Sequence, residues 1–196
     1  MKFDLTLIVP PKEIYNGLPY GDWATIWCNW LFSDQDQVGS VYFLRGNVHG
    51  ERDVVMTGKN SLTIYSDLAI FFPIICTFSS KLITPNAMSK MQRRKDSTKP
   101  ERDPTLLKLN INDTEIPNLL DHYAESNEFT LEVKRMSPLL RYFNSSVKTG
   151  TSEAVIAGYW ILLKPLPVGT YRIKFEGRHK DGFMTSGDYS IEIKNR

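Results

Sequence analysis

Three histidines, His49, His122 and His179, are the side chains of this 196-residue chain that titrate near neutral pH when unperturbed. His49 lies in a polar segment that also contains Glu51 and Asp53. A histidine oriented by a carboxylate can act as a general base, so His49, Glu51 and Asp53 are the catalytic candidates of this sequence. A solvated hairpin loop explains the same composition, and we favour it over an active site.

The remaining titratable residues give no further catalytic site. His122, beside Asp121, is expected on the surface, and His179 in a solvated loop. No histidines have the spacing of a zinc helix or flank a Cys-x-x-Cys pair, so we expect no metal site. Phosphate-loop, dinucleotide and Gly-x-Ser-x-Gly motifs are missing from the sequence, so no cofactor is expected. Cys28 and Cys76 each lie in an apolar run and are predicted to be buried free thiols.

A basic segment at residues 85–104 contains the ligand-binding candidates Arg93, Arg94 and Lys95. Such a cluster could contact phosphates or an acidic surface of a partner. It lacks interleaved aromatic residues, and acidic residues are interspersed in it, so we favour an exposed, mobile insertion over a nucleic-acid contact. The net charge of +2 for the whole chain also argues against a general nucleic-acid footprint.

The elements that position these residues are predicted to be mainly β-strands. Period-two alternation is clearest over residues 154–196, where a Pro/Gly turn at 165–169 and a longer loop at 177–187 separate three strands. Alternation also predicts strands at 3–9, 41–44, 62–64, 106–111 and 129–133, and the apolar run at 69–77 predicts a strand buried on both faces. A short helix is predicted at 116–123. Pro73 within an apolar run predicts an edge, a bulge or an irregular break.

One further helix is indicated by aromatic residues. Trp23, Trp27 and Trp30 recur at helical spacing, and Asp22 could cap the helix that contains them. Exposed rings of this kind could stack on sugars, but we favour a core position beside Ile26 and Leu31. With 41% hydrophobic residues the chain can bury a sizeable core. The expected fold is therefore a single domain, residues 1–196, mainly β, an antiparallel sandwich or jelly-roll-like structure with one short Trp-rich helix.

Several pieces of the chain, taken in order, resemble an uncharacterised family of mostly exported microbial β-rich proteins. They are the Trp-rich helix, Gln-Val-Gly-Ser-Val-Tyr-Phe-Leu-Arg-Gly at 37–46, Phe-Phe-Pro at 71–73 and Gly-Tyr-Trp at 158–160. The resemblance implies the same architecture and no known activity. The family pattern has an exported leader, a tryptophan pair, a cysteine and an aspartate. Here the N-terminus shows no signal peptide. Cys28 follows Trp27 in place of a tryptophan pair, Leu62 occupies the cysteine position, and Ala157 occupies the aspartate position.

The lack of a signal peptide and of a run of about 18 apolar residues predicts a cytoplasmic or other non-exported protein without a membrane span. We expect a non-catalytic binding or structural module with a protein partner or self-association, one version being a subunit of a larger assembly such as a virion shell. An enzyme that acts on a carbohydrate or small metabolite is the alternative, and a carbohydrate-binding module is a further one.

Overall fold

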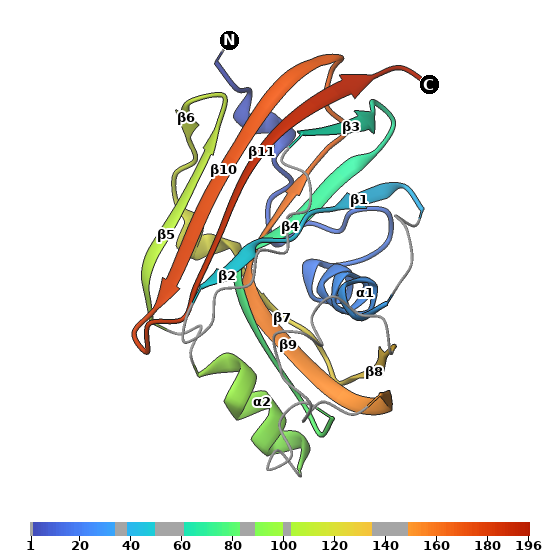
Figure 1. Ribbon diagram of the computed structural model, residues 1–196, viewed down its shortest axis with the longest axis vertical. Helices are drawn as coiled ribbons and strands as arrows, with labels where there is room; N and C mark the ends of the chain where they lie inside the picture. The colour runs from blue at the N-terminus through green and yellow to red at the C-terminus, as the bar shows by residue number, and fades with distance from the viewer. Residues whose placement is uncertain (1, 34–38, 50–60, 83–88, 100–102, 135–148) are drawn as a thin grey trace.

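Two long apolar strands, β4 (Ala69–Ser80) and β9 (Gly150–Leu163), lie antiparallel at the centre of a five-stranded sheet (Figure 1). The computed structural model describes residues 2–33, 39–49, 61–82, 89–99, 103–134 and 149–196. In this sheet β1 (Val41–Phe43) runs parallel to β4, while β7 (Tyr123–Glu125) and β8 (Phe129–Val133) both pair with β9.

The second sheet has six strands and is built on the C-terminal hairpin. The hairpin consists of β10 (Gly169–His179) and β11 (Met184–Lys194). β5 (Pro104–Ile111) pairs with β10, and the two-residue strand β6 (Thr114–Glu115) pairs with the end of β5. On the other side, β2 (Asn47–His49) and β3 (Ser61–Tyr65) pair with different parts of β11.

The hydrophobic core has two parts, one on each face of the five-stranded sheet. Alternate residues of β4 and β9, such as Ile74 and Ile161, face the six-stranded sheet and form the core of a sandwich. The residues between them, such as Phe71 and Trp160, face helix α1 (Tyr20–Phe32) on the opposite side. Because both faces of β4 and β9 are covered, their sequences are apolar without a clear alternation.

Helix α1 confirms the predicted helix and the core positions of two of its three tryptophans, whereas Trp30 is half-buried and Ile26 is exposed. Trp23 and Trp27 are buried against the five-stranded sheet, and the Trp27 indole packs edge-on against Trp160 at a centroid distance of 5.3 Å. The Trp27 N–H donates to the carbonyl oxygen of Leu44 at 2.7 Å, so the one polar atom of this ring is satisfied. Asp22 does not cap the helix: the N-cap is Pro19, and Asp22 lies in the first turn.

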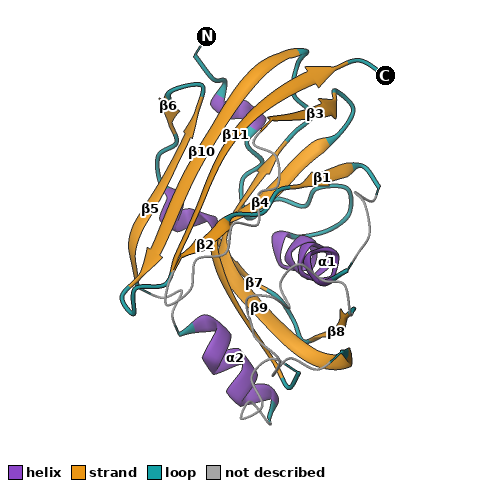
Figure 2. Cartoon of the chain, viewed as in Figure 1, coloured by secondary structure: helices purple, strands orange, loops and turns teal. Residues whose placement is uncertain are grey.

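The prediction of a mainly β, antiparallel sandwich is confirmed (Figure 2). The strands at 41–44, 62–64, 69–77, 106–111 and 129–133 all appear with small shifts at their ends. Pro73 lies in a central strand, where the register shifts between Pro73 and Ile75, so the break is a bulge. Neither helix of the described residues is both long and apolar enough to cross a bilayer.

Three predictions about elements are wrong. Residues 3–9 do not form a strand; Leu5–Leu7 is a 3₁₀ helix, whose N-terminus is capped by the Asp4 carboxylate accepting from the Thr6 N–H. The helix expected at 116–123 shortens to the 3₁₀ helix η3 (Leu119–His122). The loop expected at 177–187 is also shorter, because β10 continues to His179 and β11 begins at Met184.

The described part of the predicted mobile insertion also differs from expectation. Lys90–Thr98 forms a second helix, α2, at the ends of β4 and β9 (Figure 1). The Ser89 hydroxyl caps it by accepting from the Gln92 N–H at 3.1 Å. Three of its residues, Arg93, Ser97 and Thr98, are buried, so this part of the segment is not a solvated loop.

Candidate functional site

The catalytic candidate His49 lies at the end of β2, on the outer face of the six-stranded sheet. Its Nε2 atom is 2.9 Å from the hydroxyl oxygen of Ser186 on the neighbouring strand β11. Glu51 and Asp53 lie outside the described residues. The proposed pairing of His49 with an acid therefore stays a prediction, and so does the enzymatic function that depends on it.

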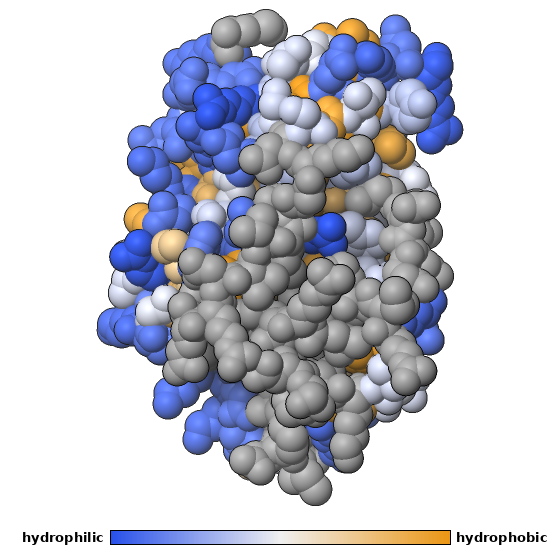
Figure 3. All heavy atoms as spheres, in the orientation of Figure 1, coloured by the Kyte–Doolittle hydropathy of each residue, from blue (hydrophilic) through white to orange (hydrophobic). Residues whose placement is uncertain are grey.

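A polar hollow of about 490 Å³ lies on the same face of the sheet and has Ser186 in its wall. Asp188 in its wall accepts two hydrogen bonds from the neighbouring Arg172 at 3.0 Å and lies 3.7 Å from the Lys174 ammonium. The hydrogen bond from Arg172 holds the pKa of Asp188 below its usual value, which makes this carboxyl a poor proton donor. Figure 3 shows mostly hydrophilic residues over β5 and β10.

The ligand-binding candidates on α2 are mostly used within the protein. Arg93 is buried and pairs with Glu128, and Arg94 pairs with Glu125. The Arg93 guanidinium is therefore not presented to solvent, whereas the Arg94 side chain is 37% exposed and Lys95 is exposed. A ligand-binding role for these residues stays a prediction.

The other two histidines are buried rather than exposed. The Nδ1 atom of His122 is 3.3 Å from the Trp160 carbonyl oxygen, which only accepts, so Nδ1 carries the proton. Burial lowers the pKa of His122, against the opposing effects of that hydrogen bond and of Asp121. His179 lies at the end of β10 and stacks on Phe183 at a centroid distance of 5.6 Å. The described residues contain no cluster of His, Cys, Asp and Glu that could hold a metal ion.

Both cysteines are free, as predicted, with Cys28 buried and Cys76 half-buried. Burial raises the pKa of the Cys28 thiol strongly, so it stays protonated and unreactive near neutral pH. Among the described residues, the exposed large aromatic side chain is Tyr65, which packs against Arg196. A carbohydrate-binding platform of two exposed rings is therefore not found in this part of the chain.

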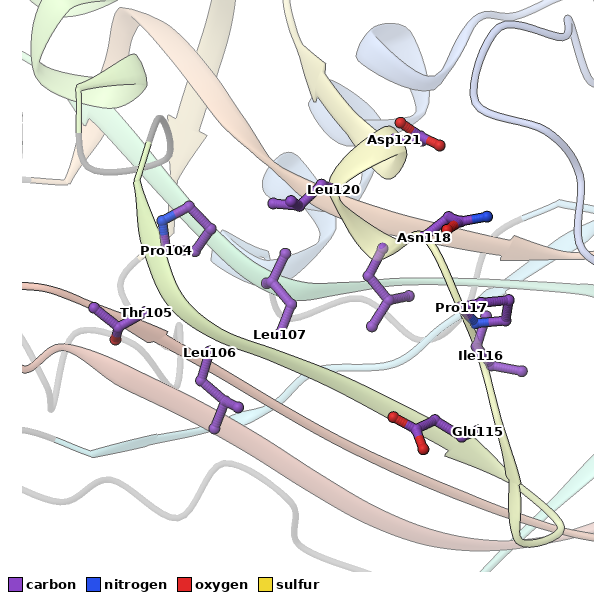
Figure 4. Close-up of a pocket in the computed structure, with 11 residues that line it drawn as sticks. Pro104, Thr105, Leu106, Leu107, Glu115, Ile116, Pro117, Asn118, Leu120 and Asp121 are labelled. Atoms are coloured by element: carbon purple, nitrogen blue, oxygen red, sulfur yellow. The ribbon is translucent and has the colours of Figure 1, made fainter.

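A different feature has the properties of a binding site. A groove of about 510 Å³ lies between the first half of β5 and the segment that runs from β6 through η3. Figure 4 shows Leu107 on β5 and Leu120 on η3 facing one another across it. Leu120 is 66% exposed, and the half-buried Leu106 and Leu107 line the same groove, so several apolar side chains gather here. The lining residues are Pro104, Thr105, Leu106, Leu107 and Glu115–Asp121.

The groove follows an unpaired edge of the six-stranded sheet. β6 pairs only with Asn110 and Ile111, so the earlier residues of β5 have β10 on one side and, within the described chain, no strand on the other. Unpaired N–H and C=O groups of such an edge are ready to bind another strand. Pro104 and the register shift at Arg178/His179 disturb the pairing at the start of β5, which confines the regular edge to the residues after them.

The groove carries negative charge. Glu115 and Asp121 line it, and no lysine or arginine does. Neither carboxylate forms an ion pair with another residue that the structure describes. Both are exposed, so a positively charged group could reach them from solvent.

Sequence reasoning did not single out this groove. One signal was present: Leu107, Leu109 and Ile111 follow the inward phase of β5, whereas Leu106 is an apolar residue in the outward phase. The Leu119-Leu120 pair is similar, since Leu119 is buried and Leu120 is exposed. Exposed apolar residues that gather at one place are more informative about an interaction site than scattered ones.

The chain matches no protein-family model, no curated protein and no solved structure. The resemblance to the exported β-rich family stays a prediction.

Proposed function

We propose that this protein is a non-catalytic binding module that receives a segment of a protein partner in the groove between β5 and η3. The observation that carries the proposal is the combination of an unpaired strand edge with the exposed Leu120 beside it. The edge supplies hydrogen-bonding groups, and the leucine supplies apolar area that a partner would cover. A peptide segment has a regular series of backbone N–H and C=O groups that can pair with a strand edge while its side chains cover the leucine, and a carbohydrate or a small metabolite lacks that series.

The apolar contribution can be compared with what binding requires. Covering a side chain as exposed as Leu120 contributes about 1–2 kcal/mol, and the half-buried Leu106 and Leu107 add to it. A dissociation constant near 1 μM corresponds to about 8 kcal/mol. The leucines alone would not reach that value, so a partner that binds this tightly also needs backbone hydrogen bonds along the edge.

The partner segment could belong to another protein or to a second copy of this chain. The second case is the assembly-subunit version of the proposal, in which neighbouring copies hold one another through sheet edges. The two cases share the same groove and the same contacts, so they can be tested with one set of variants.

The test uses a random dodecapeptide phage library panned on the immobilised full-length chain. Leu120→Asp is the variant that puts a charge into the groove. Val168→Asp is its matched control, because Val168 is 59% exposed and does not line the groove. We expect enriched peptides that bind the original chain and the Val168→Asp variant and lose at least tenfold in affinity for Leu120→Asp.

Light scattering after size exclusion then separates the two sources of the partner. A dimer that Leu120→Asp dissociates and Val168→Asp does not would identify a second copy as the occupant. Library peptides that bind Leu120→Asp as well as the original chain, or no enrichment together with a mass that neither variant changes, would overturn the proposal.

A further inference from the structure

We infer that the partner segment lies in the groove as an extended strand that pairs with β5 and carries a basic residue for Glu115 or Asp121. This inference rests on the proposed function and names the conformation and the chemistry of the occupant. It follows from three features of the groove: the direction of its backbone groups, the alternation of its side chains and its charge.

The direction of the backbone groups is fixed by one hydrogen bond. The Leu109 carbonyl oxygen accepts from the Ile116 N–H at 2.9 Å, on the side of β5 that faces away from β10. In a strand, the N–H and C=O of every second residue point to the same side. Leu107 therefore directs both of its backbone polar groups into the groove, where they can pair with an added strand.

The ladder on the other side of β5 agrees with this parity. The Asn112 N–H donates to the Arg172 carbonyl oxygen, so the even-numbered residues at this end of β5 are the ones that bond toward β10. Lys108 and Asn110 belong to that set and pair with Glu176 and Lys174. The edge-facing groups of Leu107 are thus not needed for the sheet as it stands.

Side chains along β5 alternate in the same way. Leu107 packs against the sandwich core and Leu109 is buried in it, whereas Lys108 is exposed on the outer face. Figure 4 shows Leu106 and Leu107 on opposite sides of β5. An added strand would follow this alternation, with every second side chain directed toward Leu119 and Leu120. Those positions of the occupant should be apolar.

The usable edge limits the length of the occupant. Pro104 has no N–H to donate, and Leu109 is already bonded to Ile116. The stretch between them spans about 16 Å at about 3.3 Å per residue, so five or six residues of the occupant make the contact.

Charge gives the remaining property. With two carboxylates and no basic side chain in the lining, a lysine or arginine at an end of the occupant gains favourable electrostatic interaction, and an acidic residue there is repelled. A helix laid in the groove could meet the leucines and the charges, but it would leave the edge-facing groups of Leu107 unpaired.

The experiment is an N-methyl scan of the most enriched dodecapeptide from the library, with binding measured by isothermal calorimetry. Because N-methylation removes one donor, we expect affinity losses of at least fivefold at alternate peptide residues over a stretch of five or six, with little change at the residues between them. Losses at consecutive residues, or none at any, would overturn strand pairing even if binding still depends on Leu120. Peptides that do not depend on Leu120 would instead refute the proposed function.

Variants of the protein test the strand pairing from the side of β5, and they also test the role of the two carboxylates. Leu107→Pro removes the edge-facing N–H without touching the ladder to β10, and Leu107→Ala removes the side chain but keeps that N–H. We expect Leu107→Pro to weaken binding at least fivefold more than Leu107→Ala, with thermal unfolding followed to verify that both fold. Glu115→Gln combined with Asp121→Asn should weaken binding about threefold to tenfold at low salt and less at high salt. Equal affinities at low salt would overturn the charge argument.

Discussion

Gly177 of β10 faces Ile75 of β4 so closely that a Cβ atom on Gly177 would lie 2.6 Å from the Cβ atom of Ile75. The carbonyl oxygen of Ile74 would lie 3.0 Å away. These atoms belong to the facing sheet, so at this point the two layers of the sandwich approach one another with room for a hydrogen atom only. The distance between the sheets therefore depends on a glycine at position 177.

Replacing Gly177 with alanine should destabilise the protein by about 2–3 kcal/mol, because the added methyl group forces the two sheets apart. Urea unfolding followed by tryptophan fluorescence measures the change. Thr170→Ala, on the exposed face of the same strand, is the control and should change the free energy of unfolding by less than about 1 kcal/mol. Equal effects of the two substitutions would show that the sheets can separate at no cost.

The attachment of α2 depends on the ion pair between Arg93 and Glu128, whose side chains are 5% and 18% exposed. Removing one partner of such a pair leaves the other charge partly buried, and we expect Arg93→Met to cost about 2–4 kcal/mol. Lys90 lies 4.0 Å from the same carboxylate but is 66% exposed, so Lys90→Ala should cost less than about 0.5 kcal/mol.

Amide hydrogen exchange distinguishes local detachment of α2 from global unfolding in these two variants. If α2 detaches by itself, its amides lose protection in Arg93→Met while those of β9 and β10 keep it. Protection of α2 that is the same in Arg93→Met and Lys90→Ala would contradict the role given to the ion pair.

The contrast between α2 and the C-terminal hairpin explains what the sequence could predict. β10 and β11 were predictable because Tyr171, Ile173 and Phe175 alternate with charged residues after a Pro/Gly turn. The buried residues of α2 are Arg93, Ser97 and Thr98, which no hydropathy pattern marks as core. Burial of Arg93 is possible because its guanidinium pairs with Glu128, which lies 35 positions further along the chain. A contact of that kind is invisible to local periodicity.

The candidate groove was unpredictable for a related reason. A strand edge is open or closed depending on which strands become neighbours, and β6 is too short to cover more than Asn110 and Ile111. The leucines at 106–107 and 119–120 were visible in the sequence, but only the folded arrangement of β5, β6 and η3 shows that they border one groove. His49 was predicted as a candidate from polar neighbours, and its contact with Ser186 depends on β2 pairing with β11.

His122 should make the stability of the protein depend on pH. Burial lowers its pKa in the folded state, so between that value and the ordinary value of 6.5 the unfolded chain binds more protons than the folded one. The contribution of His122 to stability is therefore complete above pH 6.5 and is lost as the pH falls toward the lowered pKa. The loss cannot exceed about 1.4 kcal/mol per pH unit.

His122→Asn tests this assignment, because the asparagine amide can still donate to the Trp160 carbonyl oxygen but does not titrate. Urea unfolding between pH 5 and pH 8 should give a shallower dependence for the variant than for the original chain. The two curves should differ little in slope above pH 7, where His122 is neutral in both states. Parallel curves over the whole range would mean that His122 titrates as it does in the unfolded chain.

Tyr20 ties the N-terminal segment to the central strand β9 through its hydroxyl group. The hydroxyl donates to the Val9 carbonyl oxygen at 2.5 Å and accepts from the Leu162 N–H at 3.2 Å, and the residue is buried. Tyr20→Phe leaves both backbone groups without this partner. We expect a loss of about 1–3 kcal/mol in the free energy of unfolding, because buried donors and acceptors that lose a hydrogen bond pay the cost of desolvation.

Tyr65→Phe is the matched control, since the Tyr65 side chain is 46% exposed. Removing its hydroxyl group should change the free energy of unfolding by less than about 0.5 kcal/mol. Ultraviolet titration gives an independent reading of the same site. Burial raises the pKa of Tyr20 strongly, against the effect of the Leu162 N–H, so Tyr20 should be among the last tyrosines to ionise. The Tyr20→Phe spectrum should therefore differ from that of the original chain only in strongly alkaline solution, whereas a difference near pH 10 would place the Tyr20 hydroxyl in contact with water.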